Sequence, residues 1–229
     1  MTIGQKHLYI NNTIWHCFSI FYSKENIAVL LNAVSDFYES NKNYMIHFSF
    51  YFSKSQGERI DNVFISEKQN SEILVAHIEQ FFEQFLKEKP SENLHPIPYS
   101  SSIWIPYSNN TTLWNGFKIP FFLIDSQDIR NFSQDISLLI TNLYDLESSY
   151  DENVISIATF LSIQLWKHQN ISIPTITDPK LAETIQSYWN LEDEDILTLW
   201  SKYANITNKI SIIYYHLNLS ENIINILFK

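Results

Sequence analysis

The sequence predicts an α+β fold: an N-terminal antiparallel sheet with helices on one face (β-α-β-β-α), followed by a mainly α-helical C-terminal half. Three observations predict it, namely a β-hairpin pattern over 44–66, helical patterns on both sides of that hairpin, and a series of helical patterns after Asp125. We expect a single domain over 1–229, with an α+β lobe at 1–120 and a helical lobe at 121–229.

The hairpin is the clearest element. In the segment 44–53 (YMIHFSFYFS) apolar residues alternate with more polar ones, the period of a strand with one face in a core. The segment 54–57 (KSQG) supplies a turn, since Gly57 has no side chain to oppose a positive φ. The segment 58–66 alternates again, which completes a β-hairpin.

The neighbouring elements complete the β-α-β-β-α order. An apolar and aromatic segment at 14–22 predicts a buried strand, and Ser23 then caps a helix over 24–39. Apolar residues at helical spacing predict a second helix over 71–87, and Pro90 ends it.

The segment 90–120 has a different character, with five prolines and several aromatic residues, including Trp104, Tyr107 and Trp114. A short strand here would make a ferredoxin-like or related sandwich. The aromatic residues either cover the sheet or line a groove for a ligand or peptide, so Tyr107 is a candidate binding residue.

The second half is expected to be helical. Caps and apolar periodicity predict five helices there, at 125–146, 151–168, 181–188, 193–203 and 208–217, with Phe228 as an alternative end for the last one.

Composition excludes several classes of function. The formal net charge of −10 makes a nucleic acid a poor partner, because phosphate backbones are anionic. The 3 glycines are too few for a Gly-rich phosphate loop. Cys17 is the only cysteine and no stretch reaches about 18 apolar residues, so we expect a cytoplasmic protein with no membrane segment.

No standard catalytic or metal signature occurs in the sequence. The seven histidines are scattered, and none forms a metal-spaced pair with another His or a Cys. His16 and Cys17 are adjacent on a predicted strand and face opposite ways, which favours core packing over metal binding. The acidic run at 192–195 is either a solvated helix start or a metal site. We expect neither a metal nor a cofactor.

Four features occur in order along the chain. The first strand carries Trp15 and is followed by a polar helix with the pair 30–31 (LL). The hairpin contains the segment 47–53 (HFSFYFS) and then 57–60 (GERI). The loop 106–119 precedes an acidic-Ser pair, and the segment 211–219 (SIIYYHLNL) lies near the C-terminus.

Together these features resemble the family that contains the glutamate-elimination domain of lanthipeptide dehydratases and the pyridine synthases of thiopeptide pathways. The chain departs from the eliminating members, which use arginines for the glutamyl carboxylates and a His for proton transfer. It has only Arg59 and Arg130, its loop lacks the family's arginines, Leu219 replaces a terminal Arg, and Tyr214 replaces a His.

These departures favour the pyridine-synthase branch. There the resemblance implies a cofactor-free, formal aza-[4+2] cycloaddition between two dehydroalanines of a modified precursor peptide, with loss of water and of the leader peptide to give a macrocycle. The implied partners are the precursor peptide, made of a leader and a dehydrated core, and other pathway enzymes. Two alternatives stay open: a glutamate-eliminating lyase that forms dehydroalanine beside a separate glutamylating dehydratase, and a non-catalytic peptide-binding or scaffold subunit.

The resemblance also implies site residues. Tyr214 would donate a hydrogen bond to the reacting amide or the departing oxygen, and His216 would give acid/base support. The two point about 200° apart on a regular helix, whereas Asn218 would share the face of Tyr214. His47, Tyr51 and Arg59 on the hairpin, together with Tyr107, are the expected substrate-binding residues.

Overall fold

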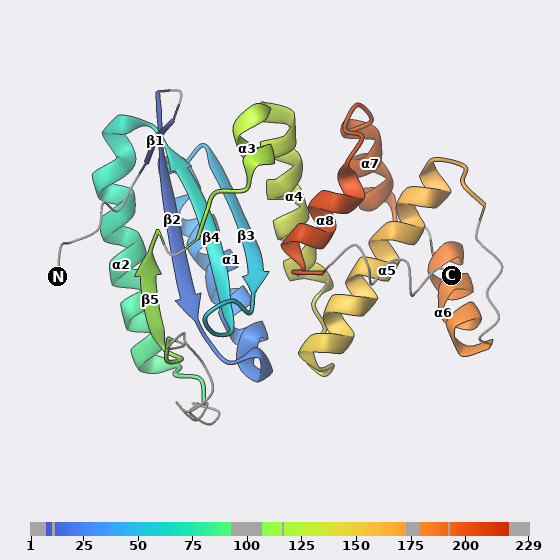
Figure 1. Cartoon of the computed structure of the whole chain (residues 1–229), viewed down its shortest axis with the longest axis horizontal. Helices are drawn as coiled ribbons and strands as arrows, with labels where there is room; N and C mark the ends of the chain where they lie inside the picture. The colour runs from blue at the N-terminus through green and yellow to red at the C-terminus, as the bar shows by residue number, and fades with distance from the viewer. Residues whose placement is uncertain are drawn as a thin grey trace. The chain divides into compact units, whose positions relative to one another are not determined.

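A computed structural model describes residues 8–10, 12–92, 107–115, 117–172, 179–191 and 193–219. It confirms the predicted fold class, because an antiparallel sheet with helices is followed by a mostly helical C-terminal half (Figure 1). The chain divides into two compact units, Met1–Asn142 and Leu143–Lys229, called here the first and the second unit. The single-domain prediction with its lobes at 1–120 and 121–229 stays a prediction.

The first unit contains all the described strands. The strands are β1 (Leu8–Ile10), β2 (Thr13–Phe21), β3 (His47–Ser53), β4 (Arg59–Ser66) and β5 (Thr111–Trp114). Its α-helices are α1 (Ile27–Asn41), α2 (Ser71–Glu88), α3 (Phe121–Asp125) and α4 (Gln127–Leu143), and its 3₁₀ turns are η1 (Lys24–Asn26), η2 (Lys42–Tyr44) and η3 (Lys68–Asn70).

The strand order is that of a ferredoxin-like sandwich. The sheet runs β1-β2-β4-β3, and β5 pairs with β2 along the part that β1 leaves free. The strand β5 therefore supplies the short strand that the sequence left open after α2. With it, the chain order β2-α1-β3-β4-α2-β5 gives four antiparallel strands and two helices.

One face of the sheet forms the aromatic core with α1 and α2; Figure 1 shows α1 behind the strands and α2 to their left. Phe37 on α1 packs against Phe64 on β4 at 5.5 Å between ring centroids, and against Phe82 on α2 at 5.2 Å. Phe82 in turn contacts Phe18 on β2 at 5.7 Å. This confirms the prediction that the alternating aromatic residues of the hairpin face a core.

The other face of the hairpin is buried as well, contrary to the prediction that only one face lies in a core. Every residue of β4 and all but Ser53 of β3 are buried. The reason is that α3 and α4 also pack on the sheet: Phe122 contacts the ring of Tyr51 and Ser133 hydrogen-bonds its hydroxyl. A period of two shows which residues share a face, but not whether that face is covered.

Two short elements were not predicted. The strand β1 has only three residues and is joined to β2 by a turn in which Asn12 has a φ of 64°. The helix α3 has five residues and directly precedes the predicted helix start at Ser126. Such short segments carry too few periods for a sequence pattern to show.

The second unit is helical. Its helices are α5 (Tyr150–His168), α6 (Pro179–Asn190), α7 (Glu194–Lys202) and α8 (Lys209–His216). Ser149 and Glu152 form a capping box at the start of α5, and the Asp193 side chain caps α7. The extension of the last predicted helix toward Phe228 lies outside the described residues.

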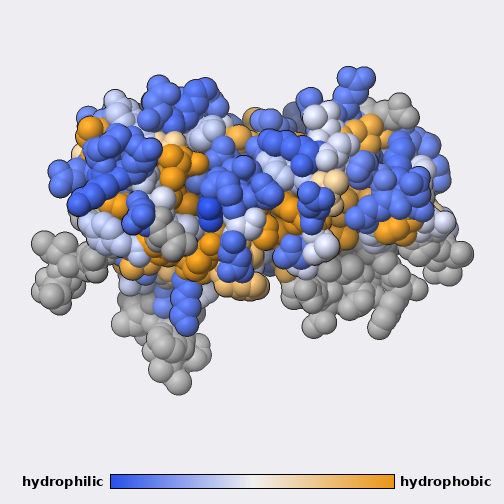
Figure 2. Space-filling model, turned by 90° about the horizontal axis from the view of Figure 1, so that it is seen from above, coloured by the Kyte–Doolittle hydropathy of each residue, from blue (hydrophilic) through white to orange (hydrophobic). Residues whose placement is uncertain are grey.

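The surface is mostly hydrophilic on the face seen in Figure 2, with hydrophobic residues showing between the polar ones. The most exposed large hydrophobic residues come from separate elements, for example Tyr9 and Phe121. Singly exposed hydrophobic residues are ordinary on a protein surface. Within the part of the chain that the structure describes, no helix is both long and apolar enough to cross a membrane.

Candidate functional site

The sheet gathers three of the predicted binding residues on the face opposite α1 and α2. Residues paired across antiparallel strands share a face, and β3 pairs with β4 as Tyr51 with Asp61 and Ser53 with Arg59. Since side chains two apart on a strand also share a face, His47, Tyr51 and Arg59 lie on one side of the sheet. We call this side the polar face.

A chain of hydrogen bonds runs along the polar face. His47 Nε2 lies 3.0 Å from Ser49 Oγ, and Ser49 Oγ lies 3.0 Å from Tyr51 Oη. Tyr51 Oη lies 3.0 Å from Ser133 Oγ on α4. Each hydroxyl can both donate and accept, so the chain holds the His47 ring in a fixed orientation and can pass a proton along its length.

A small pocket opens where His47 begins this chain. Its volume is about 70 Å³, and its lining residues are Ile10, Thr13, Trp15, Ile46, His47, Ile65, Gln127 and Arg130. All of them belong to the first unit. The pocket therefore combines a histidine, an arginine and an amide with apolar walls, the usual composition of a small ligand site.

Arg59 is held by a buried ion pair on the polar face. Its Nε donates to Asp61 Oδ1 at 2.7 Å, and Ser19 Oγ donates to the same oxygen at 2.6 Å. Desolvation raises the pKa of Asp61, while the hydrogen bonds from Arg59 and Ser19 act in the opposite direction. The guanidinium also lies 5.4 Å from the ring centroid of Phe21, so its charge is satisfied within the fold.

Tyr107 lies at the same end of the polar face. Its ring stacks on Phe21 at 4.8 Å between centroids and is 43% exposed. The structure thus brings Tyr107 and Arg59 together around one phenylalanine. Part of the segment 90–120, including Trp104, lies outside the described residues, so the choice between sheet cover and ligand groove stays a prediction.

Cys17, also on the polar face, is not a nucleophile in this setting. Burial and the nearby carboxylate of Asp61 raise the pKa of its thiol to about 12. A protonated thiol reacts poorly, since the thiolate is the nucleophile. The adjacent His16 is buried on the opposite side of the strand, where its Nε2 lies 3.1 Å from Ser66 Oγ.

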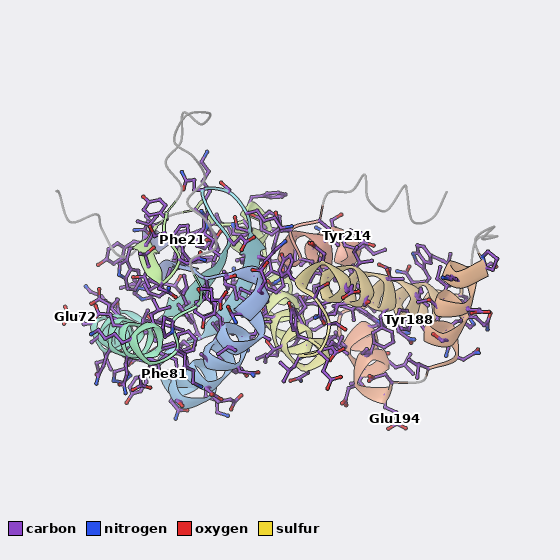
Figure 3. All side chains as sticks on the ribbon, turned by 90° about the horizontal axis from the view of Figure 1, so that it is seen from below. Phe21, Glu72, Phe81, Tyr188, Glu194 and Tyr214 are labelled. Atoms are coloured by element: carbon purple, nitrogen blue, oxygen red, sulfur yellow. The ribbon has the colours of Figure 1, made fainter. Side chains whose placement is uncertain are left out.

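In the second unit, Tyr214 lies on α8 (Figure 3). It is buried, with 3% of its surface exposed. Its hydroxyl lies 2.7 Å from Ser162 Oγ on α5. Ser162 Oγ donates its own hydrogen to the Ala158 carbonyl at 2.7 Å, so Tyr214 is the donor in this pair. Burial raises the pKa of Tyr214 against the opposing effect of Ser162, which keeps the phenol neutral.

The other two predicted residues of this helix are placed differently. His216 is fully buried at the last position of α8. Asn218 lies beyond the helix end with a φ of 54° and is exposed. The expectation that Asn218 shares a helical face with Tyr214 is therefore wrong, because the helix ends two residues too early.

Among the described residues, no group of three or more His, Cys, Asp and Glu side chains could hold a metal ion. The structure also adds polar residues that sequence reasoning missed: Ser49, Asp61, Ser133 and Ser162. The alternation of the hairpin could have identified Ser49 and Asp61. Nothing local identifies Ser133 or Ser162, whose partners lie 82 and 52 residues away in the sequence.

Comparisons with known proteins show a likeness of fold. No family model matches the chain, and no curated protein matches its sequence. Among solved structures the fold is similar to that of a pyridine synthase, TbtD, from thiomuracin biosynthesis, with a TM-score of 0.58 and 11% sequence identity. The likeness covers 91% of this chain and 93% of that one. It shows that the chain has this fold.

Proposed function

We propose that the chain is a pyridine synthase-like enzyme that acts on a modified precursor peptide in the biosynthesis of a thiopeptide. The observation that carries the proposal is the fold likeness to a pyridine synthase over 91% of the chain. The neutral buried phenol of Tyr214, near the C-terminal end of the described residues, supports it.

The proposed reaction joins two dehydroalanines. One of them, with the preceding amide in its iminol form, is the 2-azadiene, and the other is the dienophile. Two carbon–carbon bonds close a six-membered ring, and loss of water and of the leader peptide as an amide makes the ring aromatic. These reaction steps are redox-neutral overall, so the enzyme has to supply only proximity, hydrogen bonds and proton transfer.

Tyr214 is proposed to donate a hydrogen bond to the iminol oxygen or to the departing hydroxyl, and His216 to support proton transfer. A phenol whose pKa is raised by burial stays protonated at neutral pH and suits donation better than proton abstraction. Productive donation requires the Tyr214 hydroxyl to leave Ser162, and it requires the packing around this buried side chain to open to the peptide.

The remaining predicted residues are proposed to contact the peptide. His47 and Tyr51 have the strongest case, because they belong to one hydrogen-bonded chain that begins at a pocket. Tyr107 is exposed and aromatic, and it stacks on Phe21 beside Arg59. The charge of Arg59 is balanced by Asp61, which leaves Arg59 the weaker candidate. Asn218 is exposed two residues after the end of α8, so it would contact the peptide from the segment that follows the helix and not from the helix itself.

A second candidate is a non-catalytic peptide-binding subunit. The observation that favours it is the internal hydrogen bond of Tyr214 with Ser162, which satisfies the phenol without any ligand. The two candidates differ in one measurable property: turnover that depends on the Tyr214 hydroxyl.

The test is incubation of the purified protein with a leader-bearing thiazolyl peptide that contains two dehydroalanines, followed by mass spectrometry. We expect the macrocycle and the released leader amide. Tyr214→Phe should lower turnover about 100-fold or more, since it removes one donor to a developing charge. The matched control is Tyr215→Phe on the same helix, because Tyr215 is 45% exposed, and it should leave turnover unchanged.

Tyr214→Phe is expected to stay folded. Ser162 keeps its bond to Ala158 O, so the substitution costs about 0.5–1.5 kcal/mol, the net value of one hydrogen bond. Intact linear peptide after long incubation with the wild-type protein contradicts the synthase. Peptide binding without turnover, equal in the wild type and in Tyr214→Phe, supports the second candidate.

A further inference from the structure

The pocket at the His47 end of the polar face contains a cation with no described counter-ion. Arg130 on α4 borders this pocket. Its Nη1 donates to Leu123 O at 2.7 Å, its Nη2 to Gln127 Oε1 at 2.8 Å, and its Nε to the same oxygen at 3.2 Å. A guanidinium has five N–H donors, so these three bonds, all to neutral oxygens, leave two.

The charge of Arg130 is therefore not balanced by a nearby anion. Within the ranges that the structure describes, no carboxylate lies at ion-pair distance from it, whereas Arg59 has Asp61. Desolvation by the surrounding fold lowers the pKa of Arg130, which means that its charged form is destabilised where it stands. A bound anion would offset that cost.

The rest of the pocket is preorganised. Trp15 Nε1 donates to Thr13 Oγ1 at 2.7 Å, and Thr13 Oγ1 donates to Ile10 O at 2.6 Å, so one wall is fixed by its own hydrogen bonds. His47 is held by Ser49, which lies two residues further along the same strand, β3. A ligand would enter without reordering these side chains, which reduces the entropy cost of binding.

Size and charge select the ligand class. A volume of about 70 Å³ is several times the roughly 10–15 Å³ that one water needs, and a carboxyl group fits. One guanidinium fork matches the two oxygens of a carboxylate, whereas phosphate sites normally gather several cations. The net charge of −10 also disfavours a doubly charged ligand.

We propose that this pocket binds a carboxylate group of a peptide, from an acidic side chain or from a free C-terminus, with Arg130 as the charged anchor. The proposal concerns binding alone, so it stands or falls independently of any cyclase activity.

The chain offers a direct test, because Arg59 and Arg130 are its only arginines. Protein labelled with ¹⁵N-arginine gives two side-chain Nε–Hε signals, and Arg130→Lys identifies the Arg130 signal by its loss. Titration with acetyl-Gly-Glu-Gly-amide should shift the Arg130 signal saturably and leave the Arg59 signal in place. Acetyl-Gly-Gln-Gly-amide should shift neither, and acetyl-Gly-Gly-Gly with a free C-terminus tests the second source of the carboxylate.

Gln127→Glu provides the decisive variant. It places a carboxylate where Arg130 already bonds, so it should balance the guanidinium charge from within the protein and weaken binding of the acidic peptide about tenfold or more. Gln186→Glu is the matched control, because Gln186 is also exposed on a helix and also bonds an Asn four residues on. It should bind as the wild type does. The proposal is overturned if neither carboxylate peptide shifts Arg130, or if the glutamine peptide shifts it equally.

Discussion

At the scale of single residues, the polar face depends on the ion pair between Arg59 and Asp61. Both side chains are almost fully buried, and their N–O distance is 2.7 Å. A buried charge is tolerated only when it is paired, so each partner constrains the other. Ser19 completes the set by donating to the same carboxylate.

This pair gives a prediction about stability. Asp61→Asn leaves the Arg59 guanidinium buried without a counter-charge, and we expect a loss of about 3–5 kcal/mol in the free energy of unfolding. The double variant Arg59→Met/Asp61→Leu should recover most of it, because no charge is then buried. Urea titration followed by circular dichroism measures both.

The control for this prediction is the exposed pair of Lys42 and Glu39, which has a similar distance of 2.8 Å. Glu39→Gln should cost about 0–1 kcal/mol, since exposed ion pairs contribute little. If Asp61→Asn and Glu39→Gln lower the free energy of unfolding equally, then burial does not make the ion pair of Arg59 more important than an exposed pair.

Sequence reasoning reached part of this site. Alternation placed His47 and Tyr51 together on the less apolar face, and the register confirms that they share it. The same pattern missed Asp61 as the partner of Arg59, although the two are two residues apart on one strand. The contact of Tyr51 with Ser133 could not be predicted, because it is made by tertiary packing alone.

At the scale of elements, α4 protects the edge of the sheet. The strand β3 is the last in the order, so half of its backbone N–H groups face away from β4. Side chains of α4 accept two of them: Gln134 Oε1 from Phe48 N at 3.0 Å and Ser137 Oγ from Phe50 N at 3.0 Å. A helix thus takes the place of a further strand.

We therefore predict that Ser137→Ala weakens this edge. The buried N–H of Phe50 loses its acceptor, which should cost about 1–3 kcal/mol and speed hydrogen exchange at that amide. Ser201→Ala is the control, because Ser201 makes the same bond to the carbonyl four residues earlier but is exposed on α7. Its effect should stay within about 0.5 kcal/mol. Equal exchange at Phe50 in the wild type and in Ser137→Ala contradicts the edge role.

The sequence predicted the helix α4 but not its hydrogen bonds to the edge strand β3. The Asp125-Ser126 pair indicated a helix start, and α4 begins at Gln127. The residues that bond β3 are polar, so helical periodicity assigns them no partner. The packing position of such a helix depends on the sheet edge that it contacts. The pattern of residues along the helix gives no information about that edge.

At the scale of the whole molecule, the chain is similar to a solved structure in fold but hardly in sequence. The fold likeness extends over nine-tenths of the chain at 11% identity. The likeness is therefore one of fold, and the sequence predicted the class of that fold. The chemistry of individual sites is not fixed by a fold, which is why each proposed residue requires its own test.

The division into two compact units places α3 and most of α4 with the sheet, and it falls between Asn142 and Leu143. The sequence favoured a lobe boundary at 120, because the proline-rich segment ends at Pro120 and the helical pattern follows from Asp125. The residue pattern of a segment predicts whether it forms a helix or a strand. The compact unit to which the segment belongs is decided by its tertiary contacts, which the pattern does not show.

Each unit has its own core, and this predicts that local stability is organised by unit. Ile78 on α2 and Ile163 on α5 are both fully buried, and each Ile→Val substitution should cost about 0.5–1.5 kcal/mol. A loss of 1 kcal/mol raises the open population about fivefold. Native-state hydrogen exchange should then show Ile78→Val speeding exchange in β2 and β4 but not in α5, and Ile163→Val the reverse. If either substitution instead speeds exchange equally in the sheet and in α5, the chain opens as one cooperative unit, as expected of a single domain.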